Sequence, residues 1–202
     1  MNTRKRCYAR SCRLTIRWAL ITGFLASCAT SQVLAANRSD GAVEIKACSL
    51  LSQREIEAEI KLRVEPSERS DPGYVSDGAF SSVCLWRVVE EGSVSHADAV
   101  SSRQFVILNA ISWPRGKGMS KNFLDAFYAA AEKGEIAHAP VVRKLGDDAL
   151  WWGDGLAVRR GDISFGLSVS VRELKAKAPG KSEEVLARKI LQRIDHRQLR
   201  VR

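Results

Sequence analysis

Residues 145–171 read LGDDALWWGDGLAVRRGDISFGLSVSV, and this stretch decides the fold of the chain. Residues 163–171 alternate between apolar side chains and serine or glycine, which is the pattern of a strand with one buried face. The Gly-Asp pair at 161–162 suits the centre of a two-residue hairpin turn. Such a turn places Val158 opposite Phe165. We therefore expect three antiparallel strands joined by two tight turns.

Two adjacent tryptophans lie in the first of these strands. If residues 153–155 (Gly-Asp-Gly) form a three-residue loop, the register pairs Trp152 with Leu156. Trp151 then lies on the opposite face of the sheet, with Arg159 beside it. Tryptophan and arginine are enriched at binding hot spots, so we predict that Trp151 and Arg159 line a groove for a ligand or a partner. The alternative is that Trp151 fills the core or covers bare glycine backbone.

Trp113 is a third binding candidate. It follows the apolar run FVILNAI at 105–111 and opens the Trp-Pro-Arg-Gly segment that interrupts the chain. An unbroken apolar run is typical of a central strand that is covered on both faces. Asn109 is the one polar residue of this run, and we expect it to have a hydrogen-bond partner.

Three helices are predicted from their N-terminal signals. Ser52 and Glu55 have the spacing of a capping box, which begins a helix that ends near residue 61. Ser120 precedes a helical pattern at 121–133, and Ser182 precedes the last one. Acidic residues follow Ser182 and basic residues lie near the end of that helix, as the helix dipole favours.

The order of elements predicts an α+β fold. Residues 83–89 form a strand, whereas 65–78 and 90–102 are rich in prolines, glycines or charges and are expected to be loops. We expect an antiparallel sheet of about five or six strands, with about three helices packed mainly on one face and one disulfide. The predicted boundaries are a polar lead-in at 36–46, a single domain at 47–196 and a basic tail at 197–202.

The chain begins with a pattern typical of an export signal at 1–35. Six basic residues and no acid precede an apolar run at 18–29, which is too short to span a bilayer. The Val-Leu-Ala at 33–35 fits ordinary signal cleavage. The Leu-Ala-Ser-Cys at 25–28 resembles a bacterial lipobox, in which Cys28 would be lipidated and would tether the domain to a membrane. Cleavage after residue 35 and lipidation of Cys28 remain the two alternatives.

The basic charge is concentrated in this leader. The whole chain has 32 basic and 23 acidic residues, a net charge of +9. Without the six basic residues of the leader, 26 remain against 23 acids, a net charge of +3. The high charge is therefore poor evidence for a nucleic-acid partner, and we predict none.

Cysteine usage agrees with export. Cys48 and Cys84 are the cysteines outside the leader, and two cysteines in an oxidising compartment most simply form one disulfide. The alternatives are two unpaired buried thiols and a metal site, but neither cysteine has a second ligand at metal-site spacing. We predict a Cys48–Cys84 disulfide, no metal site and no cofactor.

The chain has no recognisable catalytic motif. The nucleophile elbow, the zinc-protease helix, the phosphate-binding glycine loop and the redox Cys pair are all missing from the sequence. His96, His138 and His196 are isolated in polar segments. Asp147 and Asp148 could act as paired carboxylates in hydrolysis, but they lie where turns use aspartate to accept backbone hydrogen bonds. We therefore predict no catalytic residue.

Several short motifs resemble those of a group of small exported bacterial proteins. The motifs are A-C-x-L-L-x-x-x-E at 47–55, C-x-W at 84–86, L-G-D-x-A at 145–149 and L-x-V-x-x-G-D at 156–162. Many members are predicted lipoproteins, and the group is similar to the extracellular sensor-type domains of some bacterial kinases. The resemblance covers about residues 45–195 and implies a non-catalytic binding domain outside the cytoplasm. Residues 60–62 (Ile-Lys-Leu) depart from the group, which usually has Leu-Gly there.

These observations predict an exported, monomeric, non-catalytic binding domain in the periplasm or cell envelope, soluble or lipid-anchored. Its partner would be a small ligand or another protein. One alternative is an immunity or inhibitor protein that blocks a toxin or hydrolase in the envelope. A second alternative is a hydrolase that uses Asp147 and Asp148.

Overall fold

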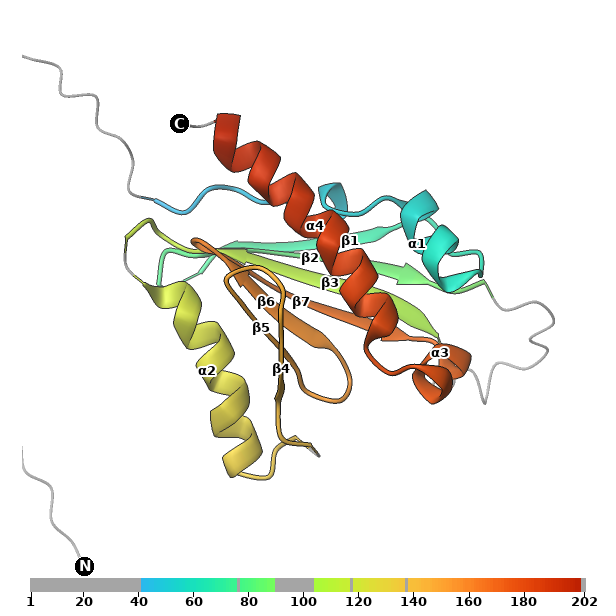
Figure 1. Ribbon diagram of the computed structural model, residues 1–202. Coiled ribbons are helices and arrows are strands. Elements are labelled where there is room, and N and C mark those ends of the chain that lie inside the picture. Colours follow the sequence, from blue (N-terminus) through green and yellow to red (C-terminus); the bar gives the residue numbers. More distant parts are fainter. Residues whose placement is uncertain (1–40, 76, 90–103, 117, 137, 201–202) are drawn as a thin grey trace, which may run out of the picture. The chain divides into compact units, whose positions relative to one another are not determined.

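The computed structural model describes residues 41–75, 77–89, 104–116, 118–136 and 138–200 (Figure 1). The predicted export signal with Cys28, the predicted loop at 90–102 and His96 lie outside these residues. The elements are η1 (Ala47–Ser49), α1 (Gln53–Ile60), β1 (Glu68–Tyr74), β2 (Phe80–Arg87), β3 (Phe105–Ser112), α2 (Met119–Glu132), β4 (Val141–Arg143), β5 (Asp148–Trp151), β6 (Leu156–Arg160), β7 (Ile163–Ser170), α3 (Arg172–Lys177) and α4 (Lys181–Arg200).

The strands form one antiparallel sheet in the order β1-β2-β3-β7-β6-β5-β4. The predicted α+β class with one disulfide is confirmed, but the described residues hold seven strands and four α-helices, more than expected. The hairpin between β6 and β7 has the predicted register, with Val158 opposite Phe165. Gly161 has φ +58° at the turn, as its predicted position requires.

One of the additional strands is β1, in a segment that we expected to be a loop. Its Pro72 and Gly73 are typical of loops, and nearly all its side chains are exposed or half-buried. The pairing with β2 shifts between Ser70 and Gly73, as in a β-bulge. An edge strand tolerates proline and glycine because one side of its backbone needs no partner. The periodicity of the sequence therefore gives no signal for β1.

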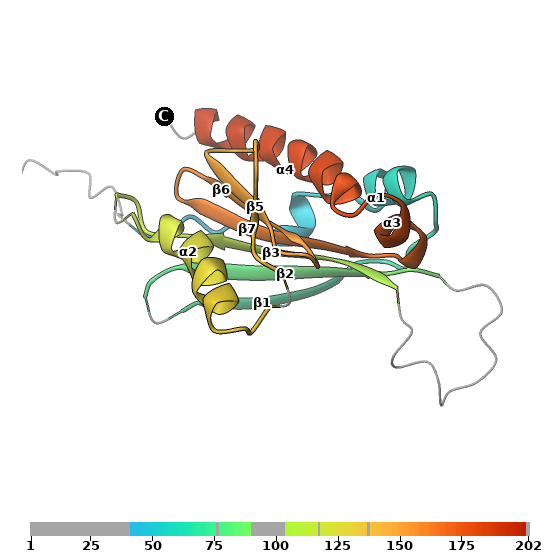
Figure 2. The same cartoon turned by 60° about the horizontal axis from the view of Figure 1, so that its bottom comes forward.

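Helices cover both faces of the sheet (Figure 2). The larger core lies under η1, α1 and α4, where Leu186, Ile190 and Ile194 of α4 pack against the strands. A smaller cluster on the other face joins Leu124 of α2 to Leu150 and Ala157. Most helices thus share one face, as expected, but α2 forms a layer of its own on the opposite face.

The register between β5 and β6 corrects our prediction for the two tryptophans. Trp151, not Trp152, lies opposite Leu156, because residues 152–155 form a four-residue loop in which the Trp152 N–H donates to the Gly155 carbonyl at 3.1 Å. One extra loop residue exchanges the faces of both side chains. Trp151 therefore enters the main core, and Trp152 packs beside Gly166 on the α2 face.

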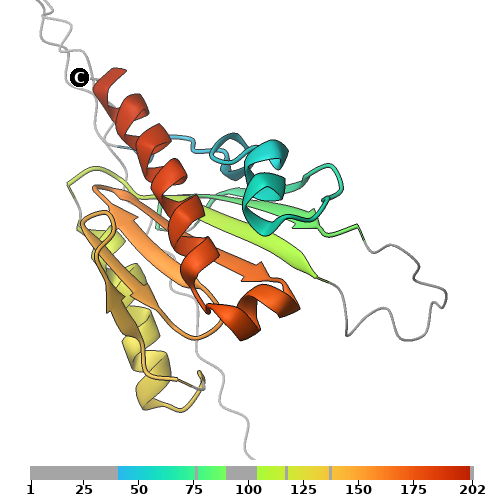
Figure 3. The same ribbon diagram turned by 45° about the vertical axis from the view of Figure 1, so that its right-hand side comes forward.

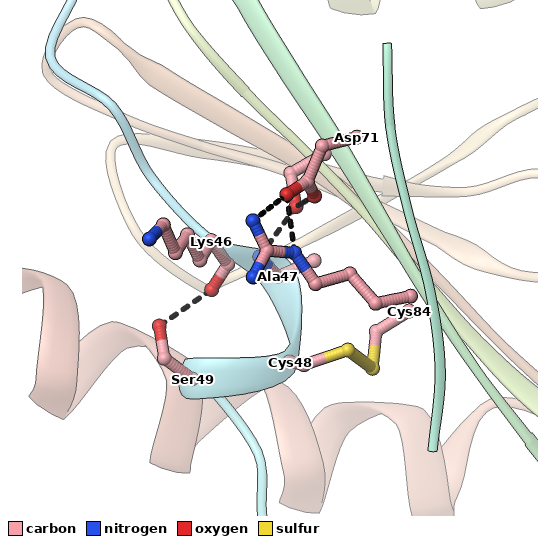
Figure 4. Close-up of a disulfide and its surroundings, with 8 residues drawn as sticks. Lys46, Ala47, Cys48, Ser49, Asp71 and Cys84 are labelled. Atoms are coloured by element: carbon pink, nitrogen blue, oxygen red, sulfur yellow. Dashed lines mark hydrogen bonds and ion pairs between the residues drawn. A yellow bond between two sulfur atoms is a disulfide. The ribbon is translucent and has the colours of Figure 1, made fainter. Parts of the chain in front are cut away.

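The disulfide between Cys48 and Cys84 is confirmed (Figure 4). It joins η1 to β2 across a separation of 36 residues, with the two Cα atoms 5.1 Å apart. Next to the disulfide, the Ala47 N–H donates a hydrogen bond to the buried Ser82 hydroxyl at 2.8 Å. That hydroxyl in turn donates to Asp71 of β1. Covalent and polar links thus fix the start of the helical layer to the sheet.

The helix N-termini follow the predictions in part. The capping box of Ser52 and Glu55 is present at the start of α1. In α2, however, Gly118 is the N-cap, and the Ser120 hydroxyl donates to the Gly161 carbonyl at 2.9 Å instead of capping. Ser182 is a residue within α4 rather than its cap. Serine makes tertiary hydrogen bonds as readily as caps, so a serine before an apolar pattern does not distinguish the two.

The ends of the predicted domain also change. Ala42 and Ile45 of the lead-in are buried, so this segment packs onto the domain. Helix α4 continues to Arg200, so the first residues of the predicted basic tail belong to it.

Asn109 differs from the prediction as well. Its Oδ1 atom is buried and has no hydrogen-bond partner among the described residues. The side chains of β3 on the face toward α2 are only partly buried within the described residues.

Among the described helices, none is long and apolar enough for a membrane span.

Candidate functional site

Trp151 and Arg159 do not form a groove together. The side chain of Trp151 is 8 % exposed and packs in the main core, with its ring against Gly180. Arg159 lies one residue after Val158 and so points to the opposite face of β6. The prediction that Trp151 is exposed beside Arg159 is therefore wrong, and its cause is the loop of one extra residue.

Arg159 instead forms ion pairs with Asp147, just before β5, and with Asp148, the first residue of β5. Its Nε donates to Asp148 at 2.9 Å, and its Nη1 lies 3.4 Å from Asp147. Arg160 donates to Asp147 at 3.0 Å and to Asp195 of α4 at 2.8 Å. This network links the start of β5 to α4. We call it the turn cluster, and its members are Asp147, Asp148, Arg159, Arg160 and Asp195.

Asp147 accepts a backbone hydrogen bond, but from the β6–β7 turn and not from its own turn. It accepts a hydrogen bond from the Gly161 N–H at 2.7 Å, and its own N–H donates to the Arg159 carbonyl at 2.9 Å. Burial alone would raise the pKa of Asp147, but the hydrogen bonds from Gly161 and Arg160 and the charge of Arg159 lower it below the usual range. A carboxylate held ionised in this way is a poor proton donor.

Three further side chains with acid–base chemistry, Asp154, His138 and His196, lie at the surface. Asp154 forms an exposed ion pair with Lys175 at 3.2 Å. His138 and His196 are both exposed, and the ring of His138 lies near Gly153. Among the described residues, no group of three or more histidines, cysteines, aspartates or glutamates could hold a metal ion.

Trp113 lies directly after β3, and hydrogen bonds fix its position. Its backbone N–H donates to the Asp162 carbonyl at 2.7 Å, across the turn between β6 and β7. Its indole Nε1 donates to the hydroxyl of Ser164 at 3.2 Å. That buried hydroxyl donates onward to the Ser120 carbonyl at 3.1 Å. The indole is therefore held at both its backbone and its ring.

Trp113 also lines a cavity of about 340 Å³, which we call the Trp113 cleft. The cleft brings together four distant parts of the chain: the lead-in, the segment after β3, the β6–β7 turn and the end of α4. Its lining residues are Val43, Glu44, Ile45, Ser112, Trp113, Arg115, Gly161, Asp162, Ile163, Arg197 and Gln198.

The cleft combines an apolar floor with charged walls. Trp113, Ile45 and Ile163 supply apolar surface, and Arg115 and Arg197 supply positive charge. Arg115 is exposed and makes no hydrogen bond or ion pair with another described residue, whereas Arg197 donates to the Ser49 hydroxyl at 2.9 Å. A ligand pocket needs this combination of apolar area and a few polar groups that fix orientation.

Of the three binding candidates, only Trp113 lines a cavity among those described. Its companions could not be found from the sequence, because Ile45 lies 68 residues before it and Arg197 lies 84 residues after it. The only local signal was the Trp-Pro-Arg-Gly segment itself, in which tryptophan and arginine lie two residues apart.

Comparison with known proteins leaves the family open. No protein-family model matches the chain, and no significant match occurs among curated proteins or solved structures. The resemblance to small exported bacterial proteins therefore stays a prediction that rests on the short motifs described above.

Proposed function

We propose that this chain is an exported, non-catalytic binding domain of the bacterial cell envelope, and that it holds a small ligand in the Trp113 cleft. The observation that carries the proposal is that Trp113, whose position is fixed by hydrogen bonds to Asp162 and Ser164, lines a cavity of about 340 Å³. Such rigid positioning lowers the entropic cost of binding.

The setting is supported by the leader and by the disulfide. A basic segment followed by a short apolar run is typical of export, and disulfides persist in oxidising compartments. The Cys48–Cys84 bond joins the helical layer to the sheet, so reduction would loosen the domain. Anchoring through Cys28 and release after residue 35 remain the two alternatives for the mature N-terminus.

The chemistry of the cleft suggests the class of ligand. Trp113 and two isoleucines among the lining residues favour a flat, apolar body, since aromatic surfaces bury large areas with little loss of conformational entropy. Arg115 and Arg197 favour a carboxylate, sulfonate or phosphate on that body, because a guanidinium donates to such groups in a forked geometry. Glu44 and Asp162 on the same walls disfavour ligands with several negative charges.

A binding role is favoured over hydrolysis by the state of the aspartates. Asp147 and Asp148 are engaged by Arg159, Arg160 and the Gly161 N–H. A general acid and base need carboxyls whose pKa values are moved apart and which face a substrate. The turn cluster instead neutralises both carboxylates within the fold.

The proposal is tested with anilinonaphthalene sulfonate, a flat apolar probe with one anionic group. The full-length protein should bind it saturably at one site, with a rise in fluorescence. Trp113→Ala should weaken binding by about tenfold, as expected for the loss of roughly 1.4 kcal/mol of contact. Arg115→Gln should weaken it by about two- to fivefold.

Arg188→Gln is the matched control, because Arg188 is an exposed arginine of α4 that does not line the cleft. This variant should bind the probe like the unaltered protein. Equal affinity in the Trp113→Ala variant would exclude the Trp113 cleft as the binding site. Intact-mass measurement of the protein from fractionated cells tests the setting separately, since it reports leader removal and acylation of Cys28.

A further inference from the structure

The two edges of the sheet differ in how they are protected against pairing with another chain. At one edge, β1 carries Glu68, Arg69 and Asp71, a proline and a β-bulge. Charges, proline and bulges are the devices by which edge strands avoid pairing. The other edge is β4, a short strand that pairs only with β5 among the described residues.

Strand β4 is short and is flanked by Pro140 and Lys144, but its first two residues present apolar side chains to solvent. Val142 is 70 % exposed and Val141 is 49 % exposed, although both are apolar and β-branched. The backbone groups on the outer side of an edge strand have no ladder partner. An extended segment beside β4 would thus meet backbone groups that have no ladder partner together with apolar side chains. The Val142 carbonyl accepts only a long hydrogen bond from its neighbour Arg143, at 3.4 Å.

A groove lies over this edge and is lined by residues of α2, β4 and β5. In the ribbon of Figure 3, α2 (yellow) runs along this side of the sheet. The cavity there measures about 500 Å³. One wall is a single helical face of α2, which presents Lys121, Leu124, Asp125 and Tyr128. Val142 and Leu150 lie across from it on neighbouring strands. Tyr128 is 41 % exposed, so the groove has an aromatic rim in reach of a docked segment.

The charges that remain available at the groove are mainly positive. The side chains of Lys121 and Lys144 are exposed and make no hydrogen bond or ion pair within the described part of the chain. Asp125 is the lining acid in the same situation. The other charged lining residues are neutralised, since Arg143 pairs with Glu184 at 3.0 Å and the two aspartates belong to the turn cluster. The groove therefore favours an acidic side chain.

We propose that β4 is a docking edge for an extended segment of a partner protein. The segment adds to the sheet beside β4, places alternate apolar side chains against Val142 and Tyr128, and sets an acidic side chain near Lys121 and Lys144. In strand addition the backbone hydrogen bonds supply affinity, and the pockets for alternate side chains supply specificity. This surface is separate from the Trp113 cleft, so it does not depend on the proposed function.

A second copy of the chain fits this edge less well. Two β4 strands related by a two-fold axis would bring Lys121 and Lys144 of both copies to one surface, and like charges oppose such an approach. A partner segment with an acidic residue meets no such repulsion. Charge complementarity therefore favours a different protein over self-association.

The test uses the full-length protein and short capped peptides in which valine alternates with threonine around one central position. The first peptide has glutamate at the centre, the second has lysine, and the third has glutamate and N-methylated backbone amides. Fluorescence anisotropy should show saturable binding of the glutamate peptide, about two- to fivefold weaker binding of the lysine peptide, and none of the methylated one. Hydrogen exchange should slow at 141–143 when the glutamate peptide is bound.

Val142→Glu should weaken binding of the glutamate peptide by about tenfold or more, since it removes an apolar contact and adds a repelling charge. The matched control is Val75→Glu, at the other edge of the sheet, where valine is 41 % exposed; it should change nothing. The double variant Lys121→Glu/Lys144→Glu should prefer the lysine peptide. All these sites are on the surface, so the variants should fold.

Three outcomes would overturn the proposal: no saturable binding of the glutamate peptide, equal binding by the Val142→Glu variant, and equal binding of the methylated peptide. Sedimentation provides a further test. A dimer that Val142→Glu dissociates would assign this edge to a second copy of the chain and contradict a heterologous partner. Loss of probe binding at the Trp113 cleft would leave these peptide results unaffected, so the two proposals fail independently.

Discussion

Arg193 of α4 donates to the carboxylate of Glu55 in α1 at 2.8 Å, across 138 residues of sequence. The same guanidinium donates to the Leu50 carbonyl at 2.7 Å. Glu55 also completes the capping box with Ser52, so one carboxylate caps α1 and joins it to α4. The two helices over the main core are therefore coupled through a single ionised group.

This coupling predicts a specific dependence of stability on pH. Burial opposes ionisation of Glu55, but hydrogen bonds from Ser52 and Arg193 and the charge of Arg193 outweigh it and lower the pKa of Glu55 from 4.5 to about 2. The folded protein thus holds this proton more weakly than the unfolded chain. The stabilisation is complete above about pH 4.5 and is lost as the pH falls toward 2.

Glu55→Gln should lower the free energy of unfolding by about 1–2 kcal/mol at neutral pH. The difference from the unaltered protein should shrink between pH 4.5 and pH 2 and is measured by urea denaturation at several pH values. Glu59→Gln is the control on the same helix, because the side chain of Glu59 makes no hydrogen bond to another described residue. A gap between Glu55→Gln and the unaltered protein that is constant with pH would refute the role of the ionised carboxylate.

The disulfide predicts a large loss of stability on reduction. Closing a loop of 36 residues stabilises the folded state by about 4 kcal/mol if the effect comes from the entropy of the unfolded chain. The double variant Cys48→Ala/Cys84→Ala should show this loss in urea denaturation. A reducing agent should shift the unaltered protein by a similar amount and leave the double variant unchanged. An unchanged midpoint of urea denaturation after full reduction would contradict a stabilising role of the disulfide.

Glu183 predicts an effect of the opposite sign. Its side chain is buried, and its Oε1 atom accepts a hydrogen bond from the Val169 N–H at 3.0 Å. Burial raises the pKa of Glu183 and outweighs the hydrogen bonds from backbone N–H groups. The folded state therefore holds this proton more tightly than the unfolded chain, and stability falls as the pH rises from the ordinary carboxyl pKa toward the raised value.

Glu183→Gln should keep the acceptor for the Val169 N–H and remove the buried charge. We expect it to be as stable as the unaltered protein at neutral pH, or more stable. Glu183→Ala should lose about 1–3 kcal/mol, because it leaves that N–H buried without a partner. Thermal and urea denaturation of the pair separate the two effects. A Glu183→Gln variant that is as unstable as Glu183→Ala would contradict this account.

The adjacent tryptophans predict two distinct defects. Trp151→Ala removes a side chain from the main core and should cost about 3–5 kcal/mol. Trp152 is only partly buried and stacks on Phe127 of α2, with ring centroids 4.7 Å apart. Trp152→Ala should cost less and should speed hydrogen exchange in α2 while sparing α4. Equal acceleration in both helices would show that Trp152 does not act through α2 alone.

The sequence predicted those parts of the fold that local patterns determine. The β6–β7 hairpin, the capping box of Ser52 and Glu55, and the Cys48–Cys84 bond all follow from short motifs, and the structure contains them. Strand β1 was missed because an exposed, bulged edge strand has no apolar alternation to detect.

The candidate site was predicted less well, for two physical reasons. The two glycines around Asp154 permit both a three- and a four-residue loop, and that one-residue difference moved Trp151 from a proposed groove into the core. The Trp113 cleft is formed by segments from both ends of the domain, so its composition depends on packing rather than on neighbours in sequence. Only Trp113 itself was within reach of sequence reasoning.

Strand β5 is the place where both helical layers are attached to one short piece of backbone. Trp151, its last residue, packs in the core under α1 and α4, and Trp152, the next residue, packs in the cluster under α2. A local opening of these few residues would withdraw an indole from each layer at the same moment. The two layers should consequently unfold in one cooperative transition, because the adjacent tryptophans couple the two faces of the sheet.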